Sequence, residues 1–289
     1  MNYYMKKQVF LLFFAISSAF FAFSQSSVWE ISKGKNKIYI GGSIHLLRPS
    51  DYPLPKEFDA AFQKADVLVF EADIDKLSSA GAANQFMNKM TYTDGKTLKS
   101  VLSEKTYIAL EDKLLGYPIP MQDLDKLKPS MAILALMAVN MNRLGITADG
   151  IDKYYYDKAK KENKRIQYLE MVDYQIDLLS KIGDGREDEF VMHSLDELKT
   201  MENDLSLLIS AWRRGSTTLI TSQIMEMQRK YPDLYQAMLV QRNKKWLSKI
   251  ENFINDNHIE FIIVGEAHLH GADGLLNLLA EKDYKVRQF

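Results

Sequence analysis

The chain has 289 residues, with 37 Lys and Arg against 38 Asp and Glu, five His and no Cys. This length can bury a substantial core, and the hydrophobic fraction of 46% and charged fraction of 26% are typical of a globular protein, not of a disordered or fibrous one. The net charge of −1 gives no reason to expect a nucleic acid or an anionic surface as partner. The lack of cysteine excludes disulfides, thiolate metal sites, iron–sulfur clusters and cysteine nucleophiles.

The first 24 residues have the three parts of a secretory signal peptide. Two lysines precede an apolar run over 9–23, and the small residues Ala22 and Ser24 fit a cleavage site before Gln25. The alternative is an uncleaved membrane anchor, but a membrane span prefers about 20 apolar residues. We therefore expect cleavage, no stable membrane span in the mature chain, and export to a bacterial periplasm or to the cell exterior.

The N-terminal part of the mature chain predicts strands with one helix between them. Residues 28–31 and 37–40 are rich in β-formers, and the sequence over 34–36 suits a hairpin turn between them. A proline-rich loop then leads to a helix over 56–64. The short apolar run over 66–71 is predicted to be a buried strand, because Val67, Val69 and Phe70 favour a pleated surface.

Between about residues 79 and 256 the pattern is mostly helical. The segment 130–144 is apolar nearly all round and predicts a central buried helix entered through Pro129. The three consecutive tyrosines at 154–156 are expected to pack in the core and at interfaces between helices. Amphipathic helices and one strand, at 165–170, follow; the helices are predicted over 151–163, 173–181, 188–212, 216–229 and 234–253.

The chain ends with a strand over 260–264, a helix over 273–281 and a strand near 284–287. This order predicts a single α/β domain over 25–289. Its mixed central β-sheet is built from both chain ends and flanked by helices, and a long, mainly helical insertion covers about 98–253.

Two of the predicted strands lead into the same short pattern, a glycine followed three residues later by a histidine. Gly42 precedes His45 after one strand, and Gly265 precedes His268 after another. Glycine lets the backbone turn sharply at the end of a strand, and the imidazole then lies over the carboxyl edge of the sheet, where open α/β sheets bind ligands. The matched pair therefore predicts a functional site.

A carboxylate follows a third strand, because Glu71 ends the apolar run over 66–70. Two imidazoles and one carboxylate form a ligand set for a divalent metal such as Zn, Mn, Co or Fe. The carboxylate alternatively serves as general base on a metal-bound water. Asp73 and Asp75 are expected to lie in a loop or to cap a helix.

The remaining candidates are weaker on sequence alone. Sequence motifs of zinc peptidases, serine hydrolases and nucleotide-binding loops are missing. His193 and His258 are interpreted as structural, whereas His270 is either a supporting group of the site or solvated, with solvation preferred. Arg242 and Asn243 lie on an amphipathic helix, where a surface salt bridge is the simple interpretation.

Six motifs in this order resemble the TraB/GumN family, which includes the Tiki metalloproteases and the pheromone-shutdown proteins. The resemblance runs from about Val28 to Phe289. The motifs are G-S-I-H (42–45), F-E-A-D (70–73), G-I-D-K-Y-Y-Y-D-K-A (150–159), Y-L-E-M-V-D-Y-Q (168–175), L-V-Q-R-N-K-K-W (239–246) and V-G-E-A-H-L-H-G-A-D-G-L (264–275).

The resemblance implies a fold of the erythromycin-esterase and haem-uptake-protein type and, for Tiki-like members, divalent-metal-dependent peptide cleavage. By motif, His45 and His268 resemble the paired histidines and Glu71 the family's acidic residue. Arg242 and Asn243 resemble its Arg-Asn pair. Glu170 and Gln175 match a further recurrent segment whose role is not implied.

One position departs from the family pattern. Glu266 stands beside His268 where the family has a small residue, and this carboxylate is either an extra ligand, a group that alters the metal preference, or a sign that the activity has changed.

Two functions from different classes follow. The preferred one is an exported, metallopeptidase-like hydrolase that binds Mn, Co or Zn through His45, His268 and Glu71 and cleaves a peptide or small-molecule substrate. Arg242 and Asn243 would stabilise the oxyanion or anchor a substrate carboxylate, while Gly42, Gly265, Glu266 and His270 would support the site. The alternative is a non-catalytic periplasmic protein that binds or sequesters metal, haem or a peptide, since a fold alone does not imply catalysis.

Overall fold

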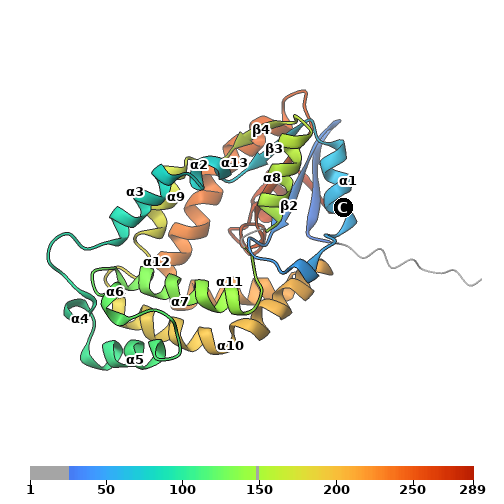
Figure 1. Cartoon of the computed structure of the whole chain (residues 1–289). Helices are drawn as coiled ribbons and strands as arrows, with labels where there is room; N and C mark the ends of the chain where they lie inside the picture. The colour runs from blue at the N-terminus through green and yellow to red at the C-terminus, as the bar shows by residue number, and fades with distance from the viewer. Residues whose placement is uncertain (1–25, 148–149) are drawn as a thin grey trace, which may run out of the picture.

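The structure, a computed structural model, describes residues 26–147 and 150–289. The predicted signal peptide at 1–24 lies outside the described residues. Among those residues, a mixed six-stranded sheet forms the centre of the fold (Figure 1). Its strands are, in sheet order, β4 (Arg165–Tyr168), β3 (Val67–Phe70), β5 (Glu260–Gly265), β2 (Asn36–Ser43), β1 (Val28–Lys33) and β6 (Lys285–Gln288).

The sheet confirms the prediction that both chain ends build it. β4, β3, β5 and β2 are parallel neighbours, whereas β1 is antiparallel to β2 and to β6. The hairpin between β1 and β2 turns where Lys33 pairs with Asn36, and Gly34 has a φ of 63°, a left-handed conformation that favours glycine. Because β3, β5 and β2 run the same way, their carboxyl ends meet at one edge of the sheet.

Each face of the sheet is covered by helices. On one face, α1 (Lys56–Lys64) contributes Phe58 and Phe62 to an aromatic core that α8 (Ile151–Lys161) completes with Tyr155 and Tyr156. On the other face, α13 (Gln241–Ile254) and α14 (Leu275–Ala280) pack Trp246, Ile250 and Leu275 on the strands, among others. The prediction that tyrosines 154–156 pack in the core is confirmed for the last two, while Tyr154 is 39% exposed.

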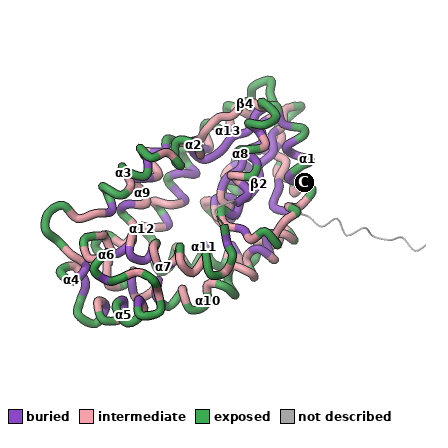
Figure 2. Tube along the Cα trace, viewed as in Figure 1, coloured by how far each residue is buried: buried purple, intermediate pink, exposed green. Residues whose placement is uncertain are grey.

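Most of the remaining helices extend away from the sheet, and α4, α5, α6, α7 and part of α10 share a separate core (Figure 1). Figure 2 shows exposed residues along α4 to α6 and buried ones in the sheet region. These helices are α2 (Ile74–Leu77), α3 (Ala80–Met90), α4 (Leu98–Val101), α5 (Glu104–Leu114), α6 (Met121–Leu124), α7 (Pro129–Arg143), α9 (Val172–Leu179), α10 (Glu187–Arg213), α11 (Thr218–Lys230) and α12 (Pro232–Tyr235); three short turns are η1 (Pro49–Asp51), η2 (Gln236–Val240) and η3 (Glu266–His268).

Two predictions about these helices need correction. The segment 130–144 forms α7 but is not a central buried helix: Ala132, Ile133 and Leu136 are buried against α5 and α10, whereas Leu134 is 39% exposed. Because α7 lies in the helical region, away from the sheet, neighbouring helices cover only one of its faces. The predicted helix over 234–253 is interrupted by η2, a π-helical turn that directly precedes α13.

Candidate functional site

Three polar side chains converge on Gly265 at the carboxyl edge of the sheet. Gly265 ends β5 and pairs with Ser43 of β2, while the end of β3 pairs with β5 on its other side. A side chain at Gly265 would place its Cβ 3.4 Å from Glu71 Oε1, 3.5 Å from His45 Nε2 and 3.7 Å from His268 Cδ2. The predicted convergence of these strand ends is therefore confirmed, while the chemical roles of the three residues stay predictions.

His45 is the accessible member of the group. Its side chain is 61% exposed, and its Nδ1 lies 2.7 Å from Asp152 Oδ2 at the start of α8. Asp152 raises the pKa of His45 to about 9, and the more distant charge of Glu71 adds to this effect. The bond to Asp152 fixes the ring so that Nε2 borders the space beside Gly265.

Glu71 is buried, and both of its carboxylate oxygens accept hydrogen bonds. Its Oε1 accepts a hydrogen bond of 2.8 Å from the Gly265 N–H, and its Oε2 accepts bonds from Arg242 Nη2 at 2.5 Å and Gln175 Nε2 at 3.3 Å. Burial alone would raise the pKa of this carboxyl, but the Arg242 guanidinium, the charge of His45 and the Gly265 N–H hold it at about 2. Glu71 is therefore a carboxylate at neutral pH.

His268 is buried, and both of its ring nitrogens have partners. Arg242 Nη1 donates to Nε2 over 3.0 Å, since a guanidinium cannot accept, and Nδ1–H therefore donates to Asn243 Oδ1 over 2.7 Å. The ring lies 4.5 Å from that of Trp246, and burial lowers the pKa of His268 to about 3. The imidazole is therefore neutral, and it presents a carbon, Cδ2, to the space beside Gly265.

Arg242 lies at the centre of the buried group. Its Nε donates to Glu170, its Nη2 to Glu71 and Glu170, and its Nη1 to His268 and the Met238 carbonyl, so all five N–H groups are used. The interpretation of Arg242 as part of a surface salt bridge is wrong, because its side chain is only 6% exposed. Its predicted role as an oxyanion donor stays a prediction and would require one of these bonds to break.

The local backbone explains how Arg242 and Asn243 reach the site. They directly follow η2, and π-helical turns are frequent at functional sites. Asn243 Nδ2 donates to the carbonyls of His268 and Asp273 and so holds the loop after β5.

The three residues predicted as metal ligands do not fit a divalent cation in this arrangement. His268 Nε2 accepts an Arg242 N–H, and Glu71 Oε1 accepts the Gly265 N–H, so both ligand atoms already have partners. Among the residues that the structure describes, no group of three or more His, Asp or Glu is arranged to hold a metal ion.

Glu266 and His270 form a separate buried pair. Glu266 Oε1 lies 2.7 Å from His270 Nε2, and its Oε2 accepts a hydrogen bond from Ser27. Gly42 leaves room for this carboxylate, because a Cβ there would lie 1.7 Å from Glu266 Oε2. The preference for a solvated His270 is wrong, since only 8% of the residue is exposed. Asp73, by contrast, caps α2 as predicted.

Sequence analysis missed two residues that shape the site. Asp152 holds His45, and Trp246 donates to Glu170 Oε2 over 3.0 Å while its ring lies 4.6 Å from the Arg242 guanidinium. Both residues belong to motifs of the family resemblance, at 150–159 and 239–246, and their place in these motifs is the sequence signal that could have identified them. The roles of Glu170 and Gln175, left open by the sequence, are contacts with Arg242 and Glu71.

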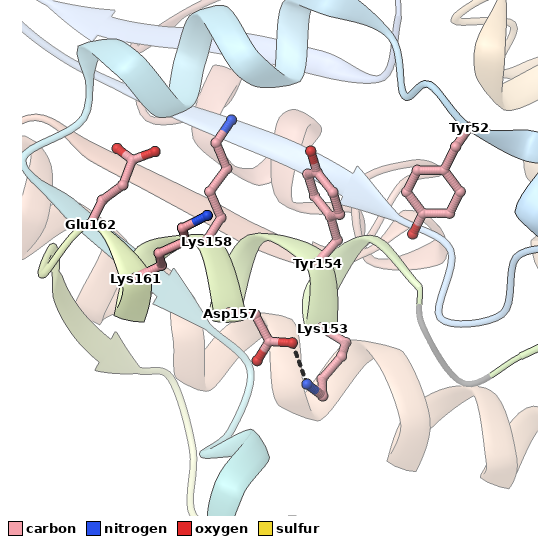
Figure 3. Close-up of a pocket in the computed structure, with 7 residues that line it drawn as sticks. All are labelled: Tyr52, Lys153, Tyr154, Asp157, Lys158, Lys161 and Glu162. Carbon is pink, nitrogen blue, oxygen red and sulfur yellow. Dashed lines mark hydrogen bonds and ion pairs between the residues drawn. The ribbon is translucent and has the colours of Figure 1, made fainter.

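A surface pocket of about 490 Å³ lies on another face of α8 (Figure 3). Tyr52 and Tyr154 line it together with Lys153, Asp157 and Lys158, among others, and Lys153 pairs with Asp157. None of the predicted site residues line this pocket, and it is separate from the group around Gly265.

Comparison with known proteins shows the family of the chain. A family model described as the TraB/PrgY/gumN family matches residues 27–288. The chain belongs to the TraB/PrgY/GumN family. It is 23% identical over 250 residues to the uncharacterized protein YbaP of Escherichia coli K12, covering 85% of this chain and 89% of the relative. The YbaP protein of Shigella flexneri matches to the same extent, and no solved structure matches the chain.

Membership of the TraB/PrgY/GumN family confirms the resemblance found in the sequence over nearly the whole of the described chain. None of the helices in the described part of the chain combines the length and apolar character that a membrane span requires.

Proposed function

We propose that this member of the TraB/PrgY/GumN family is a hydrolase whose reaction takes place beside Gly265. The observation that supports it is the pairing of an accessible histidine with a buried carboxylate: His45 Nε2 and Glu71 Oε1 border one space at the carboxyl edge of the sheet. A water in this space would be within reach of both groups. The bond a peptidase-like enzyme would cleave, an amide or an ester, has the carbonyl carbon that such a water attacks.

The residues divide the reaction between them. His45 acts in its neutral form, which predominates only above its pKa of about 9, so activity should rise with pH up to that value. In this form it accepts the proton of the water through Nε2 while the water oxygen bonds to the carbonyl carbon. The resulting imidazolium, stabilised by Asp152, then gives the proton to the leaving amine or alkoxide as the C–N or C–O bond breaks. Glu71 orients the water, and the Arg242 guanidinium keeps Glu71 ionised throughout.

Divalent-metal dependence stays a prediction, and no step above uses a metal because the three expected ligands do not fit one in this arrangement. The non-catalytic alternative drew its support from Glu266, whose carboxylate oxygens are engaged by Ser27 and His270. Export, which the N-terminal segment supports, is also part of the proposal.

The experiment is a hydrolysis assay with the mature chain on a peptide library and a panel of simple esters, with and without a chelator. His45→Gln is expected to lower the rate by about 10²–10⁴-fold, the usual contribution of a general base. His193→Gln, on α10 beside Glu197, is the matched control and should keep the wild-type rate. Equal rates for His45→Gln and wild type would contradict the proposal, as would peptide retention without any product.

A further inference from the structure

The Arg242 guanidinium is enclosed by three side chains of the kind that bind divalent metals. Glu71 Oε2 lies 2.5 Å from Nη2, Glu170 Oε1 lies 2.7 Å from Nη2, and His268 Nε2 lies 3.0 Å from Nη1. All four residues are almost fully buried, with side-chain exposures of 5% to 11%. Two carboxylates and one imidazole therefore surround a single positive charge away from solvent.

The chemistry of the guanidinium keeps a metal out of this place. Arginine has no lone pair to offer, and each N–H that points at an acceptor covers the lone pair a metal would need. A guanidinium stays charged in proteins, and here two carboxylates accept its hydrogen bonds. A second cation at this distance would be strongly repelled in a buried setting.

One pair of atoms in this group is separated by little more than the spacing of two metal ligands. Two ligand atoms about 2.1 Å from a tetrahedral metal are about 3.4 Å apart, and His268 Nε2 and Glu71 Oε1 are separated by 4.0 Å. A small movement would bring them together if the guanidinium were absent.

We propose that Arg242 is the resident cation of this site and takes the place of a divalent metal between Glu71, Glu170 and His268. The wild-type chain would then hold these three residues in position without a metal, and a neutral residue at position 242 would convert them into a metal site. This inference concerns the occupant of the site and is measured without turnover, so it can fail while the proposed hydrolase activity stands, and the reverse.

The first measurement uses the wild-type mature chain, stripped of metal and dialysed to equilibrium against Zn, Mn or Co at neutral pH. We expect its metal content to be the same as that of Glu71→Gln and His268→Ala. A stoichiometric ion that wild type holds and either variant loses would overturn the proposal.

The second measurement compares two substitutions that differ in charge. Arg242→Gln removes the positive charge and should bind one Zn or Mn ion at least tenfold more tightly than wild type, with a corresponding rise in thermal stability on metal addition. Arg242→Lys keeps the charge and should show no such gain. Adding His268→Ala to Arg242→Gln should abolish the gain.

Each outcome decides the question. A folded Arg242→Gln protein that gains no metal affinity would overturn the proposal, as would equal gains in Arg242→Gln and Arg242→Lys. Folding is checked by circular dichroism, and if Arg242→Gln does not fold, the wild-type dialysis with its two ligand variants still gives the answer.

Discussion

Glu71 and Glu260 lie at opposite edges of the same sheet and are both buried, yet the pKa values of their carboxyl groups are shifted in opposite directions. Glu71, at the carboxyl edge, accepts hydrogen bonds from Gly265, Arg242 and Gln175, and its pKa is about 2. Glu260 begins β5 at the amino edge and is 0% exposed. Neither of its oxygens has a hydrogen-bond partner among the described residues, and burial, with the charges of Asp256 and Asp66, raises its pKa to about 7.

The comparison shows that donors and charges around a buried carboxylate, and not burial itself, decide its state. Burying an ionised carboxylate without hydrogen-bond donors costs free energy, so the carboxyl of Glu260 stays protonated up to about pH 7. Three donors, one of them a guanidinium, reverse the outcome for Glu71. The carboxyl edge is thus built for a permanent negative charge, and the amino edge is not.

The largest effect should come from removing the cation of the carboxyl edge. Arg242→Ala leaves Glu71 and Glu170 buried without their partner, and breaking such a pair is expected to lower the free energy of unfolding by about 3–5 kcal/mol. Urea denaturation measures this. The control is Arg287→Ala, which removes the 70% exposed partner of Glu30 and should have little effect. Similar losses for the two variants would contradict the comparison.

The same substitution at the two edges should lower stability at one edge only. At pH 8, Glu71→Gln is expected to lower the free energy of unfolding by about 2 kcal/mol, because a charged hydrogen bond to Arg242 is lost. Glu260→Gln should leave stability unchanged or raise it, because it removes a carboxylate that lacks donors. Chemical denaturation of both variants beside wild type is the test, and a loss in both would show that Glu260 has a partner.

The pH dependence of stability separates the two carboxyls. The pKa of Glu260 is raised from 4.5 to about 7, so its stabilising contribution is complete below pH 4.5 and is lost as the pH rises through 7. The pKa of Glu71 is lowered from 4.5 to about 2, so its contribution is present above pH 4.5 and is lost as the pH falls towards 2. Unfolding curves across this range should show that Glu260→Gln removes only the loss at higher pH.

A smaller change is expected at the accessible edge of the site. Asp152→Asn removes the charge that contributes most to the raised pKa of His45, so this pKa should fall from about 9 towards 6.5. Titration of the His45 ring protons by NMR reports it, and the acid limb of any hydrolysis profile should move to lower pH. Glu197→Gln, beside His193, is the control and should leave the His45 pKa in place.

The smallest effect on stability should come from Gly265→Ala. The backbone at Gly265 has a φ of −53°, which any residue adopts, and the new methyl would lie at ordinary contact distances of 3.4–3.7 Å from its neighbours. It would nevertheless occupy the space between His45 Nε2 and Glu71 Oε1. We expect an unchanged denaturation midpoint with reduced hydrolysis, and unchanged hydrolysis would place the reacting water elsewhere.

The strands, and the site residues that directly follow them, could be predicted because the sequence patterns that indicate them span only a few residues. The apolar runs before Gly42 and Gly265 define β2 and β5, and the glycine-to-histidine spacing carries His45 and His268 past the ends of those strands. Glu71 follows from the same logic, since it ends a third parallel strand. Helix α7 could not be placed from its apolar composition, because composition does not state which faces a neighbouring helix covers.

The sequence by itself determined the sheet, the family and the residue types available for chemistry, since strand propensity and motif spacing act over a few residues. Only the tertiary structure decided what those residues do together. Arg242 enters the space between Glu71 and His268 from a helix 171 residues beyond Glu71, and Asp152 reaches His45 across 107 residues. Such contacts depend on how α8 and α13 pack on the sheet, and the free energy of that packing is summed over the whole core.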